Sequence, residues 1–179
     1  MHPLSEGVKC ILRLFAARQD RGKTPRDLKR AEEHRKSRSV RWELGKENTL
    51  NVAVRYYSRS GNTKAVADAI AEKAGVRAIA VDQKEAPLTD AADVLFIGGA
   101  LYAYGLDSHL KEYLKTLKKG DAKKAVVFST SRLSRHALDL IRKGLAEAGI
   151  AVAGETFYVK GKPDDRQLQE AAAFAGQFL

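Results

Sequence analysis

The sequence predicts an α/β fold in which a doubly wound, five-stranded parallel sheet carries helices on both faces. From residue 50 onward, short apolar or β-branched runs alternate with segments of helical periodicity. Two of these runs, "VLFI" (94–97) and "AVVF" (125–128), are apolar throughout. Continuous apolar runs are typical of central strands that are buried on both faces. Strands that alternate with helices predict parallel pairing through right-handed crossovers, and hence this fold class.

The first part of this region predicts two strands and one long helix between them. "VAVRYY" (52–57) is rich in β-branched and aromatic residues, which favour a strand. A helix is expected from 62 to about 74, because apolar residues recur on one face and Gly75 follows as a stop. "VRAIAV" (76–81) alternates only weakly, as an edge strand does. Residues 82–92 are too few for a long helix and predict a loop or a single turn.

The second half predicts three further helices and a fifth strand. A helix is expected between the two central strands, with Asp107 or Ser108 as its cap, and a second one after them that ends at Gly149. "ETFYV" (155–159) predicts the fifth strand, and the last helix should begin near Pro163. The apolar residues at helical spacing are Leu106, Leu110, Tyr113, Leu114 and Leu117, followed by Ala137, Ile141, Leu145 and Ala148.

The front of the chain, residues 1–48, differs in composition from the rest. It holds 13 Lys/Arg and 7 Asp/Glu, whereas residues 49–179 hold 19 and 15. A basic amphipathic helix is expected over 5–18, but 24–36 have almost no apolar face to bury. We therefore expect a basic extension that is partly helical or disordered, followed by one domain over 49–179. The alternative is a mis-assigned translation start, since Met1 is the only methionine and Leu50 stands immediately before the first strand.

The bulk composition favours a cytoplasmic protein. The single cysteine, Cys10, excludes an intrachain disulfide and indicates a reducing compartment. No window reaches the ~20 consecutive apolar residues of a membrane span, and basic residues interrupt the only apolar stretch near the start. The net charge of +10 could attract a nucleic acid, an anionic membrane or an acidic partner. A solvated basic arm without a partner is the simpler interpretation.

The most informative stretch is "SRSGNT" (58–63), between the first strand and the first helix. Backbone N–H groups at a helix start, together with the helix dipole, favour an anion there. Gly61 allows a tight turn, and the hydroxyl and amide side chains around it add donors. The stretch lacks both the Walker spacing and the dinucleotide G-x-G-x-x-G pattern. It therefore predicts a site for a terminal phosphate held with little positive charge, as in flavin mononucleotide sites; the alternative is a capped helix without a ligand.

Three stretches of the sequence resemble the flavodoxin family. "YYSRSGNTKAVADAIAEKAG" is similar to its first strand, phosphate loop and first helix. "ADVLFIGGALYAYGLDSHLKEYL" is similar to its third strand and second flavin loop, and "AVVFSTSRLSRHA" to its fourth strand and third loop. The resemblance covers residues 50–179. It implies a flavodoxin-like sheet of strand order 2-1-3-4-5, with FMN bound beyond the carboxyl ends of the strands.

The resemblance also implies which residues bind FMN, in three groups. The first group would hold the phosphate of FMN. It consists of the side chains of Ser58, Ser60, Asn62 and Thr63 and the backbone N–H groups of Arg59 and Gly61. The isoalloxazine would lie along Gly99, Ala100, Leu101 and Tyr102, with Tyr102 or Tyr104 stacked on the ring. Near the ribityl chain or the ring would lie Ser129 and Thr130.

The sequence departs from the family pattern in two respects. Many members supply an aromatic residue from the third loop, where this sequence has Leu133. Flavodoxins that shuttle electrons are usually acidic, whereas residues 49–179 are basic, which weighs against docking on basic partners. His109 and His136 have no partners at metal-ligand spacing, so we expect no metal site. Because the flavin does the redox chemistry, we name no catalytic acid or base.

The resemblance favours an FMN-binding electron carrier over a self-contained enzyme. Its partner would be a redox protein or a small-molecule electron acceptor, and no specific nucleic acid is expected. One alternative is an FMN-dependent oxidoreductase on the same fold, acting on a quinone or a porphyrinogen-type substrate. The other is a non-enzymatic interaction module whose basic arm binds an acidic partner and whose flavin site is vestigial.

Overall fold

The computed structural model of the protein describes residues 50–102, 105–132 and 134–179. The predicted basic extension, residues 1–48, lies outside the described residues. Among the helices of the described ranges, none combines the length and the apolar character that crossing a bilayer requires.

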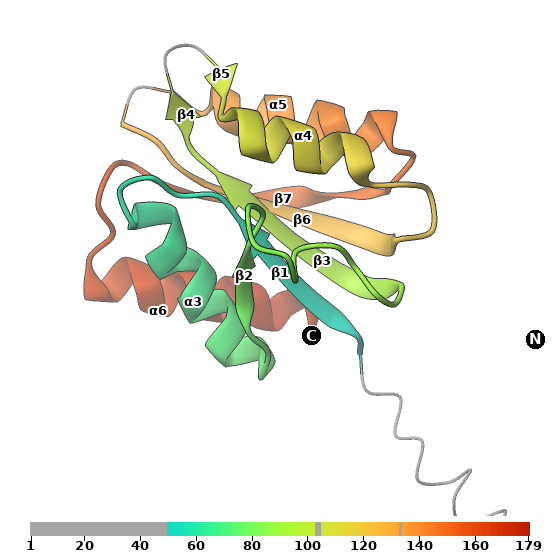
Figure 1. Cartoon of the computed structure of the whole chain (residues 1–179). Helices are drawn as coiled ribbons and strands as arrows, with labels where there is room; N and C mark the ends of the chain where they lie inside the picture. Colours follow the sequence, from blue (N-terminus) through green and yellow to red (C-terminus); the bar gives the residue numbers. More distant parts are fainter. Residues whose placement is uncertain (1–49, 103–104, 133) are drawn as a thin grey trace, which may run out of the picture. The chain divides into compact units, whose positions relative to one another are not determined.

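A five-stranded parallel sheet forms the centre of the domain, in the order β2-β1-β3-β6-β7 (Figure 1). The strands are β1 (Val52–Tyr56), β2 (Ala78–Ala80), β3 (Ala92–Gly99), β6 (Ala122–Thr130) and β7 (Val152–Val159). The order is the 2-1-3-4-5 arrangement that the family resemblance implies, because β4 and β5 lie outside this sheet. The short strand β2 lies at one edge, as its weak alternation predicts.

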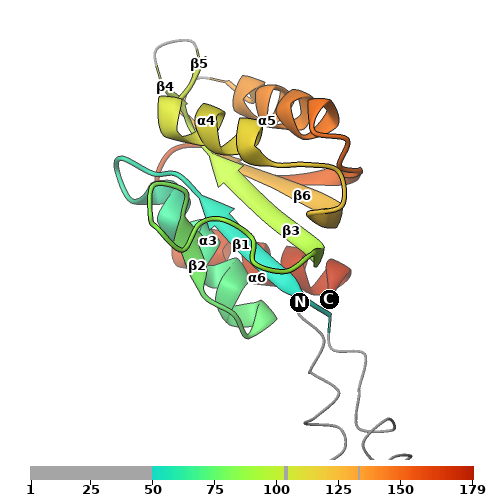
Figure 2. The ribbon, with the colours of Figure 1, turned by 45° about the vertical axis from the view of Figure 1, so that its right-hand side comes forward.

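Helices cover both faces of the sheet, as the two views show (Figures 1 and 2). Helices α3 and α6 lie on one face, and α4 and α5 lie side by side on the other. Their bounds are α3 (Asn62–Ala74), α4 (Ser108–Thr116), α5 (His136–Glu147) and α6 (Asp165–Ala175), followed by the short 3-10 helix η1 (Gly176–Phe178). All four helices fall where the sequence predicts them.

The helix ends follow from local chemistry. Gly75 ends α3 in the left-handed conformation at φ 68°, which a glycine adopts without steric cost. Asp107 caps α4, since its carboxylate accepts a hydrogen bond from the backbone N–H of His109. Asp164 begins α6 with a reciprocal capping box that includes Gln167. Residues 82–91 between β2 and the start of β3 form turns and bends, as predicted.

A small antiparallel hairpin separates β3 from α4 and was not predicted. It consists of β4 (Leu101–Tyr102) and β5 (Gly105–Leu106). Leu106, which helical spacing assigns to the following helix, lies in β5 instead. The reason is that the Asp107 cap begins the helix after Leu106, although the Leu106 side chain still packs in the core.

The sheet separates two apolar core layers. The layer under α4 and α5 includes Leu95, Ile97, Val127, Ile141 and Leu145. The layer under α3 and α6 includes Val54, Val66, Ile70, Phe96 and Phe128. Gly98 and Phe128 are directly paired on β3 and β6, and a Cβ atom on Gly98 would overlap the Phe128 ring. The absence of a side chain at Gly98 is therefore what lets this ring pack beside the end of β3.

We predict that Gly98→Ala destabilises the domain by about 1–3 kcal/mol, because the added methyl group overpacks the Phe128 ring. Gly154→Ala is the matched control, since this strand glycine has nothing within 4 Å of an added Cβ. Urea unfolding of both variants measures the difference. Equal midpoints for the two variants would show that the ring moves aside without cost.

Candidate functional site

The loop after β1 leads into α3 through a turn with a positive φ angle, which glycine adopts more easily than other residues. Gly61 has φ 82°, and no atom lies within 4 Å of an added Cβ, so the constraint is the dihedral angle rather than space. Gly61 is also the N-cap residue, and no side chain caps this helix. The helix therefore begins with uncapped backbone N–H groups and the positive end of its dipole, which suits an anion.

A buried hydroxyl pair joins the start of α3 to the end of β6. The Oγ1 atoms of Thr63 and Thr130 lie 2.7 Å apart, and both residues are buried. Because β1, β3 and β6 are parallel, their carboxyl ends lie at one edge of the sheet. The pair therefore fixes the first predicted loop against the third at this edge.

Two further hydroxyls at the same edge have no partner. The Oγ atoms of Ser58 and Ser129 are buried and make no hydrogen bond within the part of the chain that the structure describes. Buried polar atoms are nearly always hydrogen-bonded, because burial without a partner costs about 1–3 kcal/mol. Two such orphans beside an uncapped helix start indicate a polar ligand that supplies the missing bonds. A ligand with a phosphate and a polyol chain fits this donor set.

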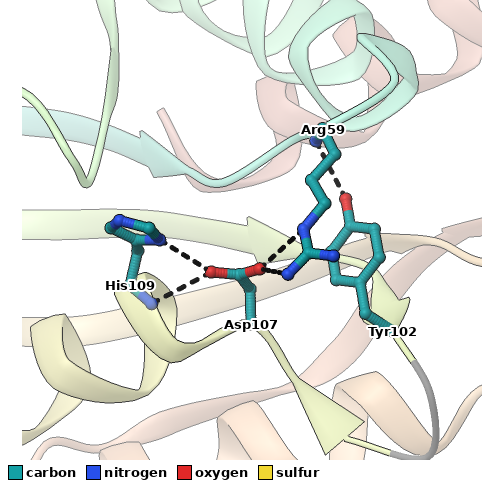
Figure 3. A network of polar contacts seen from close by, with 4 residues as sticks. All are labelled: Arg59, Tyr102, Asp107 and His109. Atoms are coloured by element: carbon teal, nitrogen blue, oxygen red, sulfur yellow. Dashed lines mark hydrogen bonds and ion pairs between the residues drawn. The ribbon is translucent and has the colours of Figure 1, made fainter.

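An ion pair joins the loop after β1 to the start of α4 (Figure 3). The Arg59 guanidinium donates from Nε to Oδ2 of Asp107 at 2.8 Å, and its Nη2 contacts the same oxygen. The other carboxylate oxygen, Oδ1, accepts from the backbone N–H of His109 at 3.0 Å and lies 2.9 Å from its Nδ1. The Asp107 side chain is only 1% exposed, so this carboxylate is shielded from water although Arg59 is not.

Tyr102 of the hairpin adds a second link to the same loop. Its hydroxyl accepts a hydrogen bond from the backbone N–H of Arg59 at 2.9 Å. The Arg59 guanidinium also lies 4.5 Å from the centre of the Tyr102 ring, in cation–π geometry. The ring of His109 stacks on Tyr57 with 5.0 Å between ring centres. Arg59 thus contacts both Tyr102 of the hairpin and Asp107, the N-cap of α4.

The surroundings of Asp107 favour its charged form. Burial by itself raises the pKa of the carboxyl, but hydrogen bonds from the side chain and backbone of His109 and from Arg59 outweigh burial. The pKa of Asp107 therefore lies below its ordinary value. The ionised carboxylate stabilises the fold, because the folded state holds that form better than the unfolded chain does.

The structure places the predicted site residues at the carboxyl edge of the sheet. The loop after β1 holds Ser58, Arg59, Ser60 and Gly61, and the first turn of α3 holds Asn62 and Thr63. Gly99 ends β3, Ala100 follows it, and β4 holds Leu101 and Tyr102. Ser129 and Thr130 end β6. Tyr104, the other candidate for ring stacking, and Leu133 of the third loop lie outside the described residues.

Two residues of the network were not predicted as site residues. Asp107 was expected only as a helix cap, and His109 only as a surface or cap residue. Local sequence signals the cap but carries no sign that Arg59 pairs with Asp107 from 48 residues away. Only the opposite charges of the two residues, each on a predicted loop, could have suggested the pair.

Comparisons with known proteins identify the family and the fold. A sequence model of the flavodoxin domain matches residues 53–178. A flavodoxin from the domain Archaea is 25% identical, with a TM-score of 0.62 over 71% of this chain and 94% of that chain. Flavodoxin 1 from Bacillus cereus is 22% identical, with a TM-score of 0.59 over 71% and 95% of the two chains. A WrbA-like flavodoxin from Agrobacterium tumefaciens is 19% identical, with a TM-score of 0.61 over 72% and 94%. The last two share the fold. A comparison with curated proteins found no match.

We predict that Asp107→Asn lowers the melting temperature more at pH 7 than in acid. In the unfolded chain the carboxyl titrates near pH ~3.9, and its folded pKa is lower, so its stabilising effect is complete above that value. The effect is lost as the pH falls from about 5 through the folded pKa. The gap between wild type and Asp107→Asn should therefore narrow from pH 7 to about pH 3.

Thermal melts at both pH values measure this gap. The control is Asp82→Asn, an exposed carboxylate that is outside the ion pairs of the described residues, and its gap should stay small throughout. A gap for Asp107→Asn that is as wide at pH 3 as at pH 7 would show that the carboxylate charge contributes nothing.

Proposed function

Because this chain belongs to the flavodoxin domain family, we propose that it binds FMN at the carboxyl edge of its sheet and carries electrons in redox reactions. One observation supports the proposal most directly. The hydroxyls of Ser58 and Ser129 are buried without a partner, and a bound flavin nucleotide would supply acceptors for both. Bound FMN provides the one- and two-electron chemistry, and the protein positions and tunes it.

The phosphate of FMN would lie on the loop that begins α3. The uncapped N–H groups after Gly61 and the helix dipole favour its charge. The side chains of Ser58, Ser60 and Asn62 would add hydrogen bonds, and Thr63 would contribute its hydroxyl, which is hydrogen-bonded to that of Thr130. Arg59 also brings a positive charge close to this loop, although its guanidinium is engaged by Asp107.

The ring of FMN would lie between the second and third loops. The backbone from Gly99 to Tyr102 would run along one side of the ring, with Ser129 and Thr130 near the ribityl chain. Tyr102 would stack on the ring with one face, while Arg59 covers part of the tyrosine from the other side. In that arrangement the Arg59–Asp107 pair would keep the phosphate loop and the ring loop at a fixed separation.

The proposal includes partners and place of action. We propose a redox protein or a small-molecule electron acceptor as the partner, and the cytoplasm as the location, since the one cysteine suits a reducing compartment. We also propose that the chain divides into a basic extension over 1–48 and the flavodoxin-like domain over 49–179.

An FMN-dependent oxidoreductase acting on a quinone or a porphyrinogen-type substrate is the second candidate. The observation that favours it is the charge of residues 49–179, which hold 19 basic and 15 acidic residues. An acidic surface suits the shuttle role on basic partners, and this domain does not have one.

We predict that Ser58→Ala combined with Ser129→Ala weakens FMN binding about tenfold or more, because two hydrogen bonds to the ligand are lost. The melting temperature of the FMN-free protein should not fall, since neither hydroxyl has a protein partner to lose. Quenching of FMN fluorescence on titration gives the affinity, and thermal melts give the stability.

The control for this experiment is Thr89→Val, an exposed hydroxyl near the opposite edge of the sheet, which should leave FMN affinity unchanged. If the double serine variant binds FMN as tightly as the wild type, the phosphate and ribityl chain do not lie at these hydroxyls. If the wild type itself neither quenches FMN nor gains thermal stability from it, the proposed function is wrong.

We predict that the FMN-loaded protein reduces menadione from NADPH at less than about 1 s⁻¹, which is below the usual range for enzymes. An electron carrier needs a partner to reduce it, whereas an oxidoreductase binds donor and acceptor itself. Steady-state absorbance at the NADPH band measures the rate. Turnover of about 10 s⁻¹ or more would favour the second candidate instead.

A further inference from the structure

A groove runs between α4 and α5, on the outer side of these helices and separate from the proposed flavin site. Its volume is about 420 Å³, within the usual range of ligand pockets. Its floor is apolar and includes Leu114 and Leu117 beside α5, and it begins at Leu106 of the hairpin. The three leucines are 5–6% exposed, so they lie at the bottom of the groove rather than on its rim.

The sequence of α5 explains why the groove exists. Leu140, Gly144 and Ala148 follow one another at spacings of four, so they form one stripe that faces α4. Gly144 lets the two helices approach, because a Cβ there would lie only 3.1 Å from the Leu114 side chain. Ala148, at the end of the stripe, adds only a methyl group to the groove lining.

Lysines line both walls of the groove. Lys111 and Lys115 project from α4 one helical turn apart, and Lys143 projects from α5. The one carboxylate in the lining is Glu147, which lies 4.0 Å from Lys143; both side chains are largely exposed. An exposed pair at this distance contributes little, so Lys143 can pair with another carboxylate at small cost.

Part of the basic excess of the domain lies in the walls of the groove. Residues 111–124 hold six lysines and two acidic residues, whereas the rest of 49–179 holds 13 basic and 13 acidic residues. The segment covers α4 from Lys111 onward, the turn after it and the start of β6. Of these six lysines, Lys111 and Lys115 line the groove, whereas Lys123 pairs with Asp93 and Lys124 lies over the Phe178 ring. Together with Lys143, the groove lining holds three lysines and one glutamate.

We propose that the α4–α5 groove binds an acidic amphipathic helix of a partner protein. A helix lies in a groove through apolar residues at i, i+4 and i+7, and its flanking carboxylates would face the lysine walls. Helix α4 has nine residues and is about 14 Å long, which matches two to three turns of a partner helix. A bilayer is a poor fit, because it is flat and the apolar residues are recessed between the lysines.

The test uses a fluorescein-labelled synthetic helix of about 18 residues, with leucines at i, i+4, i+7 and i+11 flanked by glutamates. Fluorescence anisotropy with the full chain should give a micromolar Kd that weakens at least about fivefold between ~20 and ~300 mM NaCl. Two control peptides should fail to bind: one with lysines in place of the glutamates, and one with serines in place of the leucines.

Charge reversal then locates the binding surface. Lys111→Glu with Lys143→Glu should weaken binding of the acidic peptide about tenfold or more. Lys160→Glu with Lys162→Glu changes the net charge equally on two exposed lysines outside the groove lining, and it should change the Kd by less than about twofold. Ala148→Leu, which fills the floor without altering charge, should also weaken binding.

Three results would overturn the proposal. The first is no binding of the acidic peptide. The second is that the Lys111/Lys143 and the Lys160/Lys162 charge reversals weaken peptide binding to the same extent. The third is binding to vesicles of phosphatidylglycerol that is lost only in the groove variant, because the occupant would then be a membrane. Since the measurement needs no flavin and can be repeated with FMN present, its outcome is independent of the proposed function.

Discussion

The carboxylate of Asp107 is the group on which the geometry of the candidate site most depends. A carboxylate that is 1% exposed is costly to desolvate, and the cost is offset only where several donors converge on it. Here the donors come from two directions: Arg59 from the loop after β1, and His109 from the first turn of α4. Removing any one donor would leave the carboxylate poorly satisfied, so the loop and the helix are held as one unit. The hydroxyl pair of Thr63 and Thr130 holds the third element, the end of β6, in the same unit.

The fold could be predicted from the sequence because its signals are local and periodic. The continuous apolar runs at 94–97 and 125–128 became the central strands β3 and β6, and the glycines after two helices marked their ends. The β4–β5 hairpin could not be predicted in this way. Strands of two residues are too short to show any alternation, and Leu106 has the spacing of a helical residue. The hairpin is defined by its pairing and by the Asp107 cap, not by its own sequence pattern.

The site could be predicted only in part, for a related reason. The stretch from Ser58 to Thr63 carries its own chemistry: a glycine with positive φ, an uncapped helix start and several hydroxyls. Whether a hydroxyl already has a partner, however, depends on residues far away in the chain. Within the described residues, the hydroxyls of Ser58 and Ser129 are unpaired, whereas Thr63 is hydrogen-bonded to Thr130 from 67 residues away, and the sequence gives no sign of this difference. The structure therefore distinguishes the unpaired hydroxyls from the paired ones, which the sequence cannot do.

The position of the excess charge changes how the basic character of the domain should be interpreted. Net charge suggested that the whole surface departs from that of acidic electron carriers. In the rest of residues 49–179, outside 111–124, basic and acidic residues are equal in number, so the departure is local. Exposed charges act mainly within a Debye length of about 8–10 Å, so a local excess steers partners toward its own position and not toward the surface in general. The proposed electron exchange at the carboxyl edge and the proposed docking at the α4–α5 groove would then depend on separate groups of side chains, and a substitution at one need not disturb the other.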